Sequence, residues 1–483
     1  MLTRTPTVPR PVRNPVRVAL VLVIGMIMAT LDGTIVNVAI NRLSAEFGAG
    51  LGTIQWVATG YALALGAVVP ASAWLVGRVG AKRLYLMAIT AFALGSVLAG
   101  LAWNVESLIA FRLLQGASGG LLMPVAMTIL LRAAGPERLG QLMSTLGLAI
   151  LVGPLLGPVI GGYLIDEVSW RWMFLINLPL GALVLVLASR VVPDDAPEPP
   201  KSLDVVGLLL MSPGLALVIY GVTAAGESAG FGSPAVLVPL LAGAGLIAAF
   251  VLRSLSTPVP LLDLRVLGNR TTGISATLLA LFATGYFGSM LLLPLYFQVV
   301  RGESALLAGA LAIPFALASG TTMQVAGRLI DRIPPGRYLP VSIAVALTGF
   351  VLFVVQLDAD APYWALGLTM LLMGAGGGGT MMPVITTATR PLSREQQPAG
   401  STVLNMISTT AMAIGTAVSS VTLGALLPVT GGLQALHGLD PAQRAEFAPA
   451  LAEAFQRTYV IAPVMIALAL IPALLLPRRL ADT

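Results

Sequence analysis

Two charged side chains lie deep within apolar stretches of the chain, and their positions suggest proton chemistry. Asp32 follows the apolar run Val18–Leu31, and Arg112 lies within the span that begins near Glu106. A charge at the centre of a bilayer costs about 2.5–3.5 kcal/mol on insertion scales, so such residues face a protein interior or a water-filled cavity and are functional by default. Burial favours the protonated carboxyl, whereas a neighbouring cation favours the carboxylate. Asp32 is therefore predicted to bind and release a proton.

The two charges are expected to lie at similar depth. At a helical rise of 1.5 Å per residue, Asp32 lies about 13 Å below Asn41 and Arg112 about 9 Å below Glu106. They can therefore approach each other or share a cavity. Arginine stays protonated, so Arg112 only tunes its surroundings. The alternative is a static ion pair that joins the first span to the fourth, although such pairs do not reliably stabilise a protein.

A glycine repeat marks the fifth apolar stretch, within Gly147–Gly162. Gly153, Gly157 and Gly161 recur every four residues on one helix face. Pro154, Pro158 and Gly162 lie beside them and belong to the same motif. Small residues at this spacing let two helices approach closely. We interpret the face as a tight seam between two halves of the molecule; plain helix packing is the alternative.

Short basic segments follow the second and tenth apolar stretches. Their charged residues are Arg78, Lys82 and Arg83 in the first, and Arg328, Asp331 and Arg332 in the second. Such groups can hold a closed gate through ion pairs. The alternative is that they only fix topology, because basic residues collect in cytoplasmic loops.

Further polar residues lie in or at the ends of spans, where each can contact a substrate or only join helices. These candidates for a substrate cavity are Gln55, Tyr61, Gln115, Asn177, Gln298, Gln324 and Asn405. No metal site and no cofactor are expected, because the chain has no cysteine and a single histidine, His437. Phosphate-loop, zinc-protease and hydrolase motifs are also missing from the sequence, so the expected energy source is protons rather than ATP on this chain.

The elements that carry these residues must be membrane helices. Hydrophobic residues make up 57% of the chain and charged residues only 10%, against about 25% charged in soluble proteins. A spanning helix needs about 20 apolar residues. Cutting the chain at charged and turn-forming clusters predicts an all-α membrane protein of fourteen spans: 18–40, 54–76, 84–104, 107–131, 140–164, 171–190, 205–226, 234–253, 273–299, 305–327, 338–357, 361–389, 398–427 and 458–477.

The spans are expected to form two six-helix halves with an inserted pair. Gly327–Arg332 follows the tenth span as Ala73–Arg78 follows the second, which indicates a repeat. The predicted units are residues 1–200, 201–260 and 261–483. An outside loop near 428–457 is expected to be either a surface helix or hairpin, or a solvated loop. Placing both termini in the cytoplasm puts most of the 27 Lys and Arg residues inside, as the charge rule requires.

Four segments resemble motifs of the major facilitator superfamily, and specifically of its fourteen-helix drug/proton antiporter family. They are Leu31–Ile40, Arg112–Gly116, Gly153–Gly162 and Trp170–Gly181. The resemblance implies an essential Arg112 and a major-facilitator-type fold. One departure is Gly77, where the family's loop motif carries an aspartate. The absence of a membrane acid in the tenth span argues against a preference for divalent cations.

These observations predict a proton-coupled antiporter of a bacterial inner membrane, acting as a monomer, that exports small amphipathic compounds by alternating access. It is not expected to be an enzyme or to bind nucleic acid. Three alternatives stay open: a dedicated exporter of one metabolite, antibiotic or lipid; a symporter for uptake, which the fifth-span motif disfavours; and a membrane sensor, for which no long soluble region exists.

Overall fold

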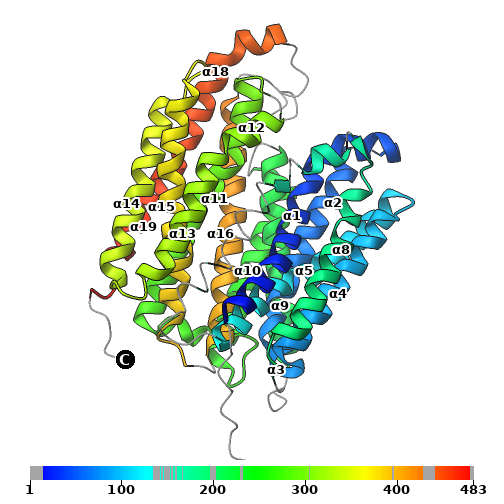
Figure 1. Cartoon of the computed structure of the whole chain (residues 1–483), viewed down its shortest axis with the longest axis vertical. Coiled ribbons are helices and arrows are strands. Elements are labelled where there is room, and N and C mark those ends of the chain that lie inside the picture. The colour runs from blue at the N-terminus through cyan, green and yellow to red at the C-terminus, as the bar shows by residue number, and fades with distance from the viewer. Residues whose placement is uncertain are drawn as a thin grey trace, which may run out of the picture.

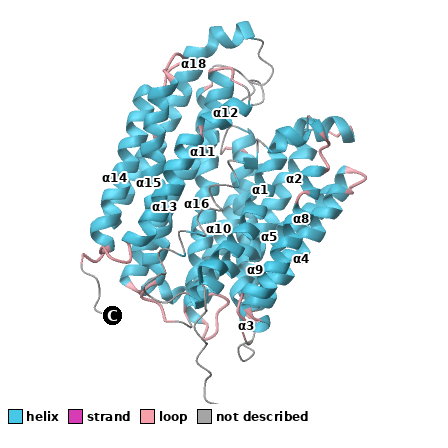
Figure 2. Cartoon of the chain, viewed as in Figure 1, coloured by secondary structure: helices cyan, strands magenta, loops and turns pink. Residues whose placement is uncertain are grey.

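The computed structural model describes most of the chain, and the described part consists of helices joined by loops. The described residues are 15–49, 51–133, 142, 145, 153, 156–157, 160–165, 167–195, 203–228, 232–303, 305–393, 396–427 and 441–478. Every regular element within these ranges is a helix, as Figure 2 shows.

The helices fall into two groups with a pair between them (Figure 1). The first group comprises α1 (Pro15–Phe47), α2 (Leu51–Val68), η1 (Val69–Ala71), α3 (Ser72–Val79), α4 (Ala81–Gly100), α5 (Val105–Ala133), α7 (Trp172–Leu175) and α8 (Asn177–Val191). The inserted pair is α9 (Val205–Ser228) and α10 (Pro234–Ser256), followed by η3 (Leu264–Gly268). The second group comprises α11 (Arg270–Leu295), η4 (Tyr296–Val300), α12 (Ala305–Leu311), α13 (Ile313–Leu329), α14 (Pro335–Gln356), α15 (Tyr363–Thr389), α16 (Gln397–Leu426), α18 (Pro441–Tyr459) and α19 (Ile461–Leu474).

Thirteen segments within the described residues are long and apolar enough to cross a membrane. They correspond to thirteen of the predicted spans; the other, 140–164, lies largely outside the described residues. The boundary predicted for the last span is wrong: the segment runs from Glu446 to Leu474, because α18 passes almost directly into α19. The predicted outside loop is therefore a helix from Pro441 onward, and residues 428–440 lie outside the described part.

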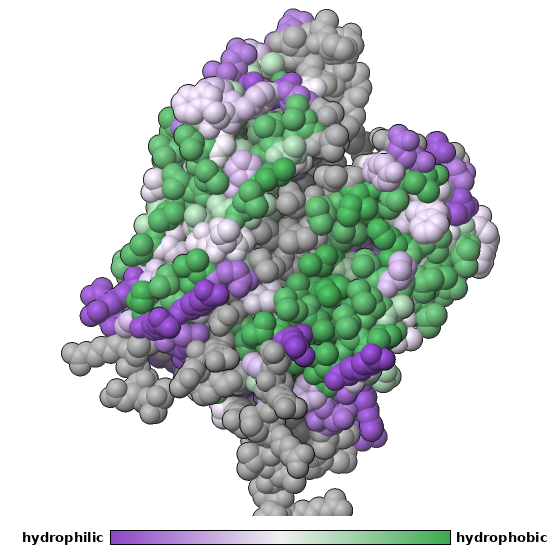
Figure 3. Space-filling view, in the orientation of Figure 1, coloured by the Kyte–Doolittle hydropathy of each residue, from purple (hydrophilic) through white to green (hydrophobic). Residues whose placement is uncertain are grey.

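The surface of the molecule matches a lipid environment. Large apolar side chains such as Leu94, Leu209 and Leu241 are more than half exposed. Figure 3 shows apolar residues across the middle of the visible face, with hydrophilic residues gathered toward both ends. Exposing this apolar surface is unfavourable in water but not in the hydrocarbon core of a bilayer. The chain is therefore a multi-pass membrane protein.

The inserted helix α9 packs against both groups, on α2 and on α16. On the first side, the rings of Trp56 and Tyr220 stack with centroids 5.7 Å apart. On the other side, Val218 and Val222 form a cluster with Ala417. The pair thus covers one seam between the groups.

The two groups meet at the end of the molecule that carries α3, called here the α3 end. The hydroxyls of Ser72 on α3 and Thr402 on α16 lie 3.2 Å apart, and both side chains are buried. Beside them, Val69, Phe250 and Met406 belong to one apolar cluster drawn from both groups and the pair. The helices of the two groups diverge toward the end of the molecule that carries α18 (Figure 1). The structure is therefore closed at the α3 end.

Close packing in the second group depends on the glycine run of α15. A Cβ on Gly374 would overlap the carbonyl of Phe315, and one on Gly378 would overlap the carbonyl of Ser319, both on α13. On the opposite face, Gly376 meets Ala346 of α14 in the same way. The run lets three helix backbones touch, as small residues do between membrane helices.

Replacing Gly378 with alanine is expected to lower the stability of the protein by about 1–3 kcal/mol, because overpacking displaces backbone. The matched control is Gly367→Ala on the same helix, where a Cβ would meet nothing within 4 Å. That change should be neutral or stabilising by up to about 1 kcal/mol from helix propensity. Thermal unfolding in detergent measures both, and equal unfolding temperatures for the two variants would refute the packing argument.

Candidate functional site

A buried ion pair joins α1 to α5 in the first group. The Nη1 atom of Arg112 lies 2.5 Å from the Oδ2 atom of Asp32, and neither side chain has any exposed surface. The predicted approach of the two residues is confirmed. Because a buried charge without a partner is far more costly than a paired one, each side chain makes the position of the other tolerable.

The carboxylate of Asp32 receives two more hydrogen bonds from uncharged side chains. Gln115 Nε2 donates to its Oδ1 at 2.9 Å, and Asn177 Nδ2 donates to the same oxygen at 2.7 Å. The donors come from α5 and α8, so three helices meet at one carboxylate. Both residues were predicted as cavity candidates; here they belong to the Asp32 cluster, defined as Asp32, Arg112, Gln115, Asn177 and Tyr61.

The guanidinium of Arg112 is held on several sides. Its Nε donates to the carbonyl of Val57 at 3.1 Å, and Nη1 also donates to Gln115 Oε1 at 2.8 Å. The ring of Tyr61, another cavity candidate, lies beneath it with 4.0 Å between Cζ and the ring centroid. Such cation–π contacts strengthen when water is excluded. The Nη2 atom is buried and has no hydrogen-bond partner among the residues that the structure describes.

A second hydrogen-bond chain orients Asn177. Its Nδ2 also donates to Ser96 Oγ at 2.9 Å, and Ser96 in turn donates to the carbonyl of Phe174 at 2.8 Å. This arrangement aims the amide nitrogen, rather than the oxygen, at Asp32. Sequence reasoning missed Ser96, because a single serine in an apolar span carries no distinguishing signal.

The glycine face of the fifth apolar stretch packs against α1. A Cβ on Gly153 would overlap Thr30, and one on Gly157 would overlap Thr34; these residues lie on either side of Asp32. Gly161 meets Ile35 in the same way, whereas Gly162 has open space. The predicted close approach is confirmed. The interpretation as a seam between halves is wrong for these glycines, because the helix they contact belongs to the first group.

The remaining candidates lie elsewhere. Gln298 is in η4, Gln324 in α13 and Asn405 in α16, where Thr409 donates to it at 3.2 Å; none belongs to the Asp32 cluster. Outside the described part lie Pro154, Pro158 and the side chain of Gln55.

The charges predicted for gating sit at the α3 end. Arg78, Arg83 and Arg332 are exposed. Lys82 pairs with Asp194 at 2.9 Å, and Asp331 pairs with Arg390 at 2.5 Å. Each of these pairs joins parts of one helix group, so neither is a latch across the two groups.

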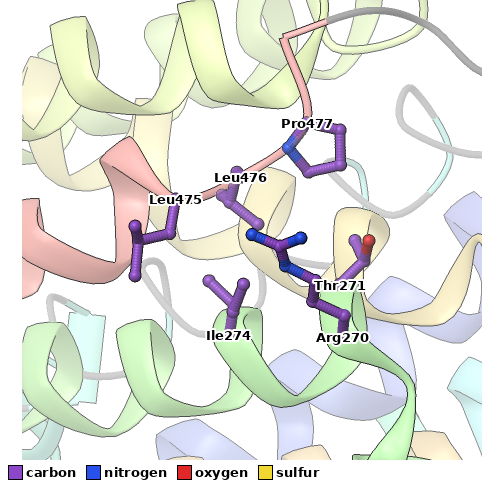
Figure 4. A pocket seen from close by; sticks show the side chains of 6 residues that line it. All are labelled: Arg270, Thr271, Ile274, Leu475, Leu476 and Pro477. Atoms are coloured by element: carbon purple, nitrogen blue, oxygen red, sulfur yellow. The ribbon is translucent and has the colours of Figure 1, made fainter.

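One surface pocket lies between the start of α11 and the end of α19 (Figure 4). Its lining consists of Arg270, Thr271, Ile274, Leu475, Leu476 and Pro477. It contains none of the predicted cavity residues and no member of the Asp32 cluster, so we do not assign the substrate to it.

The fold and the buried charges define a multi-pass membrane transporter. The family model for the Major Facilitator Superfamily matches residues 22–416. The chain therefore belongs to that superfamily, and it is a transporter of small molecules rather than an enzyme.

Known relatives are similar along nearly the full chain. A multidrug resistance protein B homolog of Mycobacterium tuberculosis is 37% identical over 96% of this chain and 91% of its own length. The lincomycin resistance protein LmrB of Bacillus subtilis is 29% identical over 97% and 96%. Among solved structures, the human organic anion transporter MFSD10 aligns with a TM-score of 0.60 at 15% identity, over 94% of this chain and 99% of that one. This last likeness shows the fold alone.

Removing the cation of the buried pair should destabilise the protein. Arg112→Gln leaves Asp32 buried without its charge partner, which costs about 3–5 kcal/mol. Adding Asp32→Asn should recover part of that loss, because no buried charge then remains. Chemical unfolding in mixed micelles measures the free energy of unfolding of the original protein, of Arg112→Gln and of the double variant.

The matched control is Arg171→Gln. Arg171 forms an ion pair with Glu46, and their side chains are 41% and 35% exposed, respectively. An exposed pair is worth about 0–1 kcal/mol, so this variant should unfold almost like the original protein. If the Arg112 variant is no less stable than this control, the pair does not carry the energy assigned to it.

Proposed function

We propose that this chain is a proton-coupled antiporter that exports small amphipathic compounds, with Asp32 as its proton-binding residue. The observation that carries the proposal is the fully buried carboxylate of Asp32, bound by Arg112, Gln115 and Asn177. Relatives named for multidrug and lincomycin resistance support efflux as the direction of transport.

Protonation of Asp32 would change the contacts of α1. Each carboxylate oxygen now only accepts hydrogen bonds, Oδ2 from Arg112 and Oδ1 from the two amides. A protonated oxygen becomes a donor, and it then faces an N–H group that also donates. One of these contacts must break or turn away. The charge state of one atom is thereby linked to the packing of α1 against α5 and α8.

Such a link provides coupling between proton and substrate. A ligand shifts a conformational equilibrium only through its different affinity for the two states. If the proton favours one arrangement of α1 and the substrate the other, binding of each expels the other, and this coupling is reciprocal. The closure at the α3 end supports this mechanism, because alternating access requires a state that is shut on one side.

The orientation of the exporter follows from charge. Basic residues at the α3 end, including Arg78 and Lys82, support a cytoplasmic position of that end and of both termini in a bacterium, by the charge rule. Substrate would enter from that side or from the inner leaflet, and protons would reach Asp32 from the opposite side.

The exporter is proposed to work as a monomer, since one chain carries the whole Asp32 cluster.

Asp32→Asn should abolish transport driven by a pH gradient, since asparagine keeps the size of the side chain but has no carboxyl group to bind and release a proton. The variant leaves Arg112 buried without its charge partner, so it should be less stable than the original protein, and size-exclusion chromatography must show a folded, monodisperse sample before reconstitution. Purified protein in proteoliposomes, with ethidium and Hoechst 33342 as probes, should then pump no faster than empty vesicles. Movement of each dye down its own gradient should persist.

The matched control is Glu46→Gln on the same helix, whose carboxylate is 35% exposed and pairs with Arg171; this variant should pump normally. Undiminished pH-driven efflux by Asp32→Asn would show that Asp32 belongs to a static ion pair. Proton-coupled transport of only one compound from a wider panel would support the dedicated exporter instead.

A further inference from the structure

The two charged junctions at the α3 end differ in the origin of their acid. In the second group, Asp331 follows α13 directly and accepts a hydrogen bond at 2.5 Å from Arg390, the residue after α15. Arg390 also donates to the carbonyl of Ile330 at 3.3 Å. The acid therefore comes from the junction itself, and it holds the junction to the end of α15.

The first group keeps the arginine of this arrangement but lacks the acid. The repeat between Gly327–Arg332 and Ala73–Arg78 aligns Asp331 with Gly77. Arg132, in the last turn of α5, is the counterpart of Arg390, because α5 and α15 are each the second long helix after the junction.

A carboxylate from a distant segment occupies that place. Asp195, just beyond the end of α8, accepts from Arg132 Nη1 at 3.1 Å through Oδ2. The same oxygen accepts from the backbone N–H of Ala81 at 2.6 Å, and Oδ1 accepts from that of Lys82 at 3.1 Å. One side chain thus connects α8, the start of α4 and the end of α5.

The turn between α3 and α4 is shaped around this carboxylate. Gly80 has a φ of +90°, and a Cβ on it would lie 3.2 Å from Asp195 Oδ1, so a side chain there would be both strained and crowded. The first N–H groups of a helix have no partner within the helix, and a negative charge beside them is favourable. Asp195 meets both requirements for α4.

We propose that Asp195 is a positioning residue that replaces the missing acid at Gly77 and makes α3, α4, α5 and α8 move as one body. That body presents Ser72 to Thr402, the contact between the groups at the closed end. The neighbouring Asp194 does not share this role. Lys82 lowers the pKa of the Asp194 carboxyl by its hydrogen bond, yet that side chain is 93% exposed, against 21% for Asp195.

A cysteine reporter tests this without substrate or proton gradient. The chain has no cysteine, so Ser72→Cys gives a unique thiol, buried while the α3 end is closed. Labelling by N-ethylmaleimide is measured on purified protein in lipid nanodiscs. Asp195→Asn should raise the labelling rate about tenfold, which corresponds to losing about 1.4 kcal/mol of preference for the closed arrangement. Gly77→Asp in the same protein should return the rate to its starting value.

Two comparisons separate positioning from a local capping role. Asp195→Asn removes the charge and also one of the two oxygens that accept from the α4 backbone, whereas Arg132→Gln removes the ion pair and leaves both oxygens in place. Arg132→Gln should accelerate labelling as much as Asp195→Asn, and the two changes together should add little. Asp194→Asn should leave the rate unchanged.

The proposal is wrong if Asp195→Asn leaves the labelling rate of the Ser72→Cys protein unchanged. It is also wrong if adding Gly77→Asp to Asp195→Asn does not lower that rate again. If Asp195→Asn does not fold, the double variant with Gly77→Asp must restore monodisperse protein, or the proposal is equally refuted. Because labelling requires neither transport nor protonation of Asp32, the result is independent of the proposed coupling mechanism.

Discussion

A charged pair that has left water must find its whole solvation shell within the protein, and this requirement organises the first helix group. Asp32 and Arg112 are fully buried, and a lone charge at that depth would cost several kcal/mol. The shell is assembled from α2, α5 and α8: a backbone carbonyl at Val57, an aromatic face at Tyr61, and amides at Gln115 and Asn177. Any movement of α1 must therefore exchange the three partners of Asp32, which are Arg112, Gln115 and Asn177, together.

Close helix contacts keep that shell dry. The glycines of the fifth apolar stretch meet α1 at Thr30 and Thr34, immediately around Asp32, where larger side chains would force the helices apart. A gap there would admit water and weaken the electrostatic contacts, since the local dielectric constant would rise. The glycine face and the charge cluster are thus two parts of one site, and the first excludes the solvent that would screen the second.

The α3 end shows how a repeated architecture tolerates divergence. Arg390 and Arg132 occupy corresponding places, and each is paired with an aspartate. In one group the aspartate belongs to the junction, and in the other it comes from the segment after α8. The ion pair at a helix end requires only that a carboxylate lie close to the arginine. The segment that supplies this carboxylate can therefore differ between the two groups.

The sequence by itself determined the class of the molecule, most spans, and the two buried charges. A membrane span is recognised from the length of an apolar run, and depth follows from counting residues along a helix. The sequence therefore predicts that Asp32 and Arg112 lie at similar depth and can approach each other or share a cavity. Only the tertiary structure decided the partners of these residues. Ser96, Asp195 and the contact of Gly153 with α1 depend on how helices rotate and which ends meet. These relations join residues far apart in the chain, for which a local pattern carries no signal.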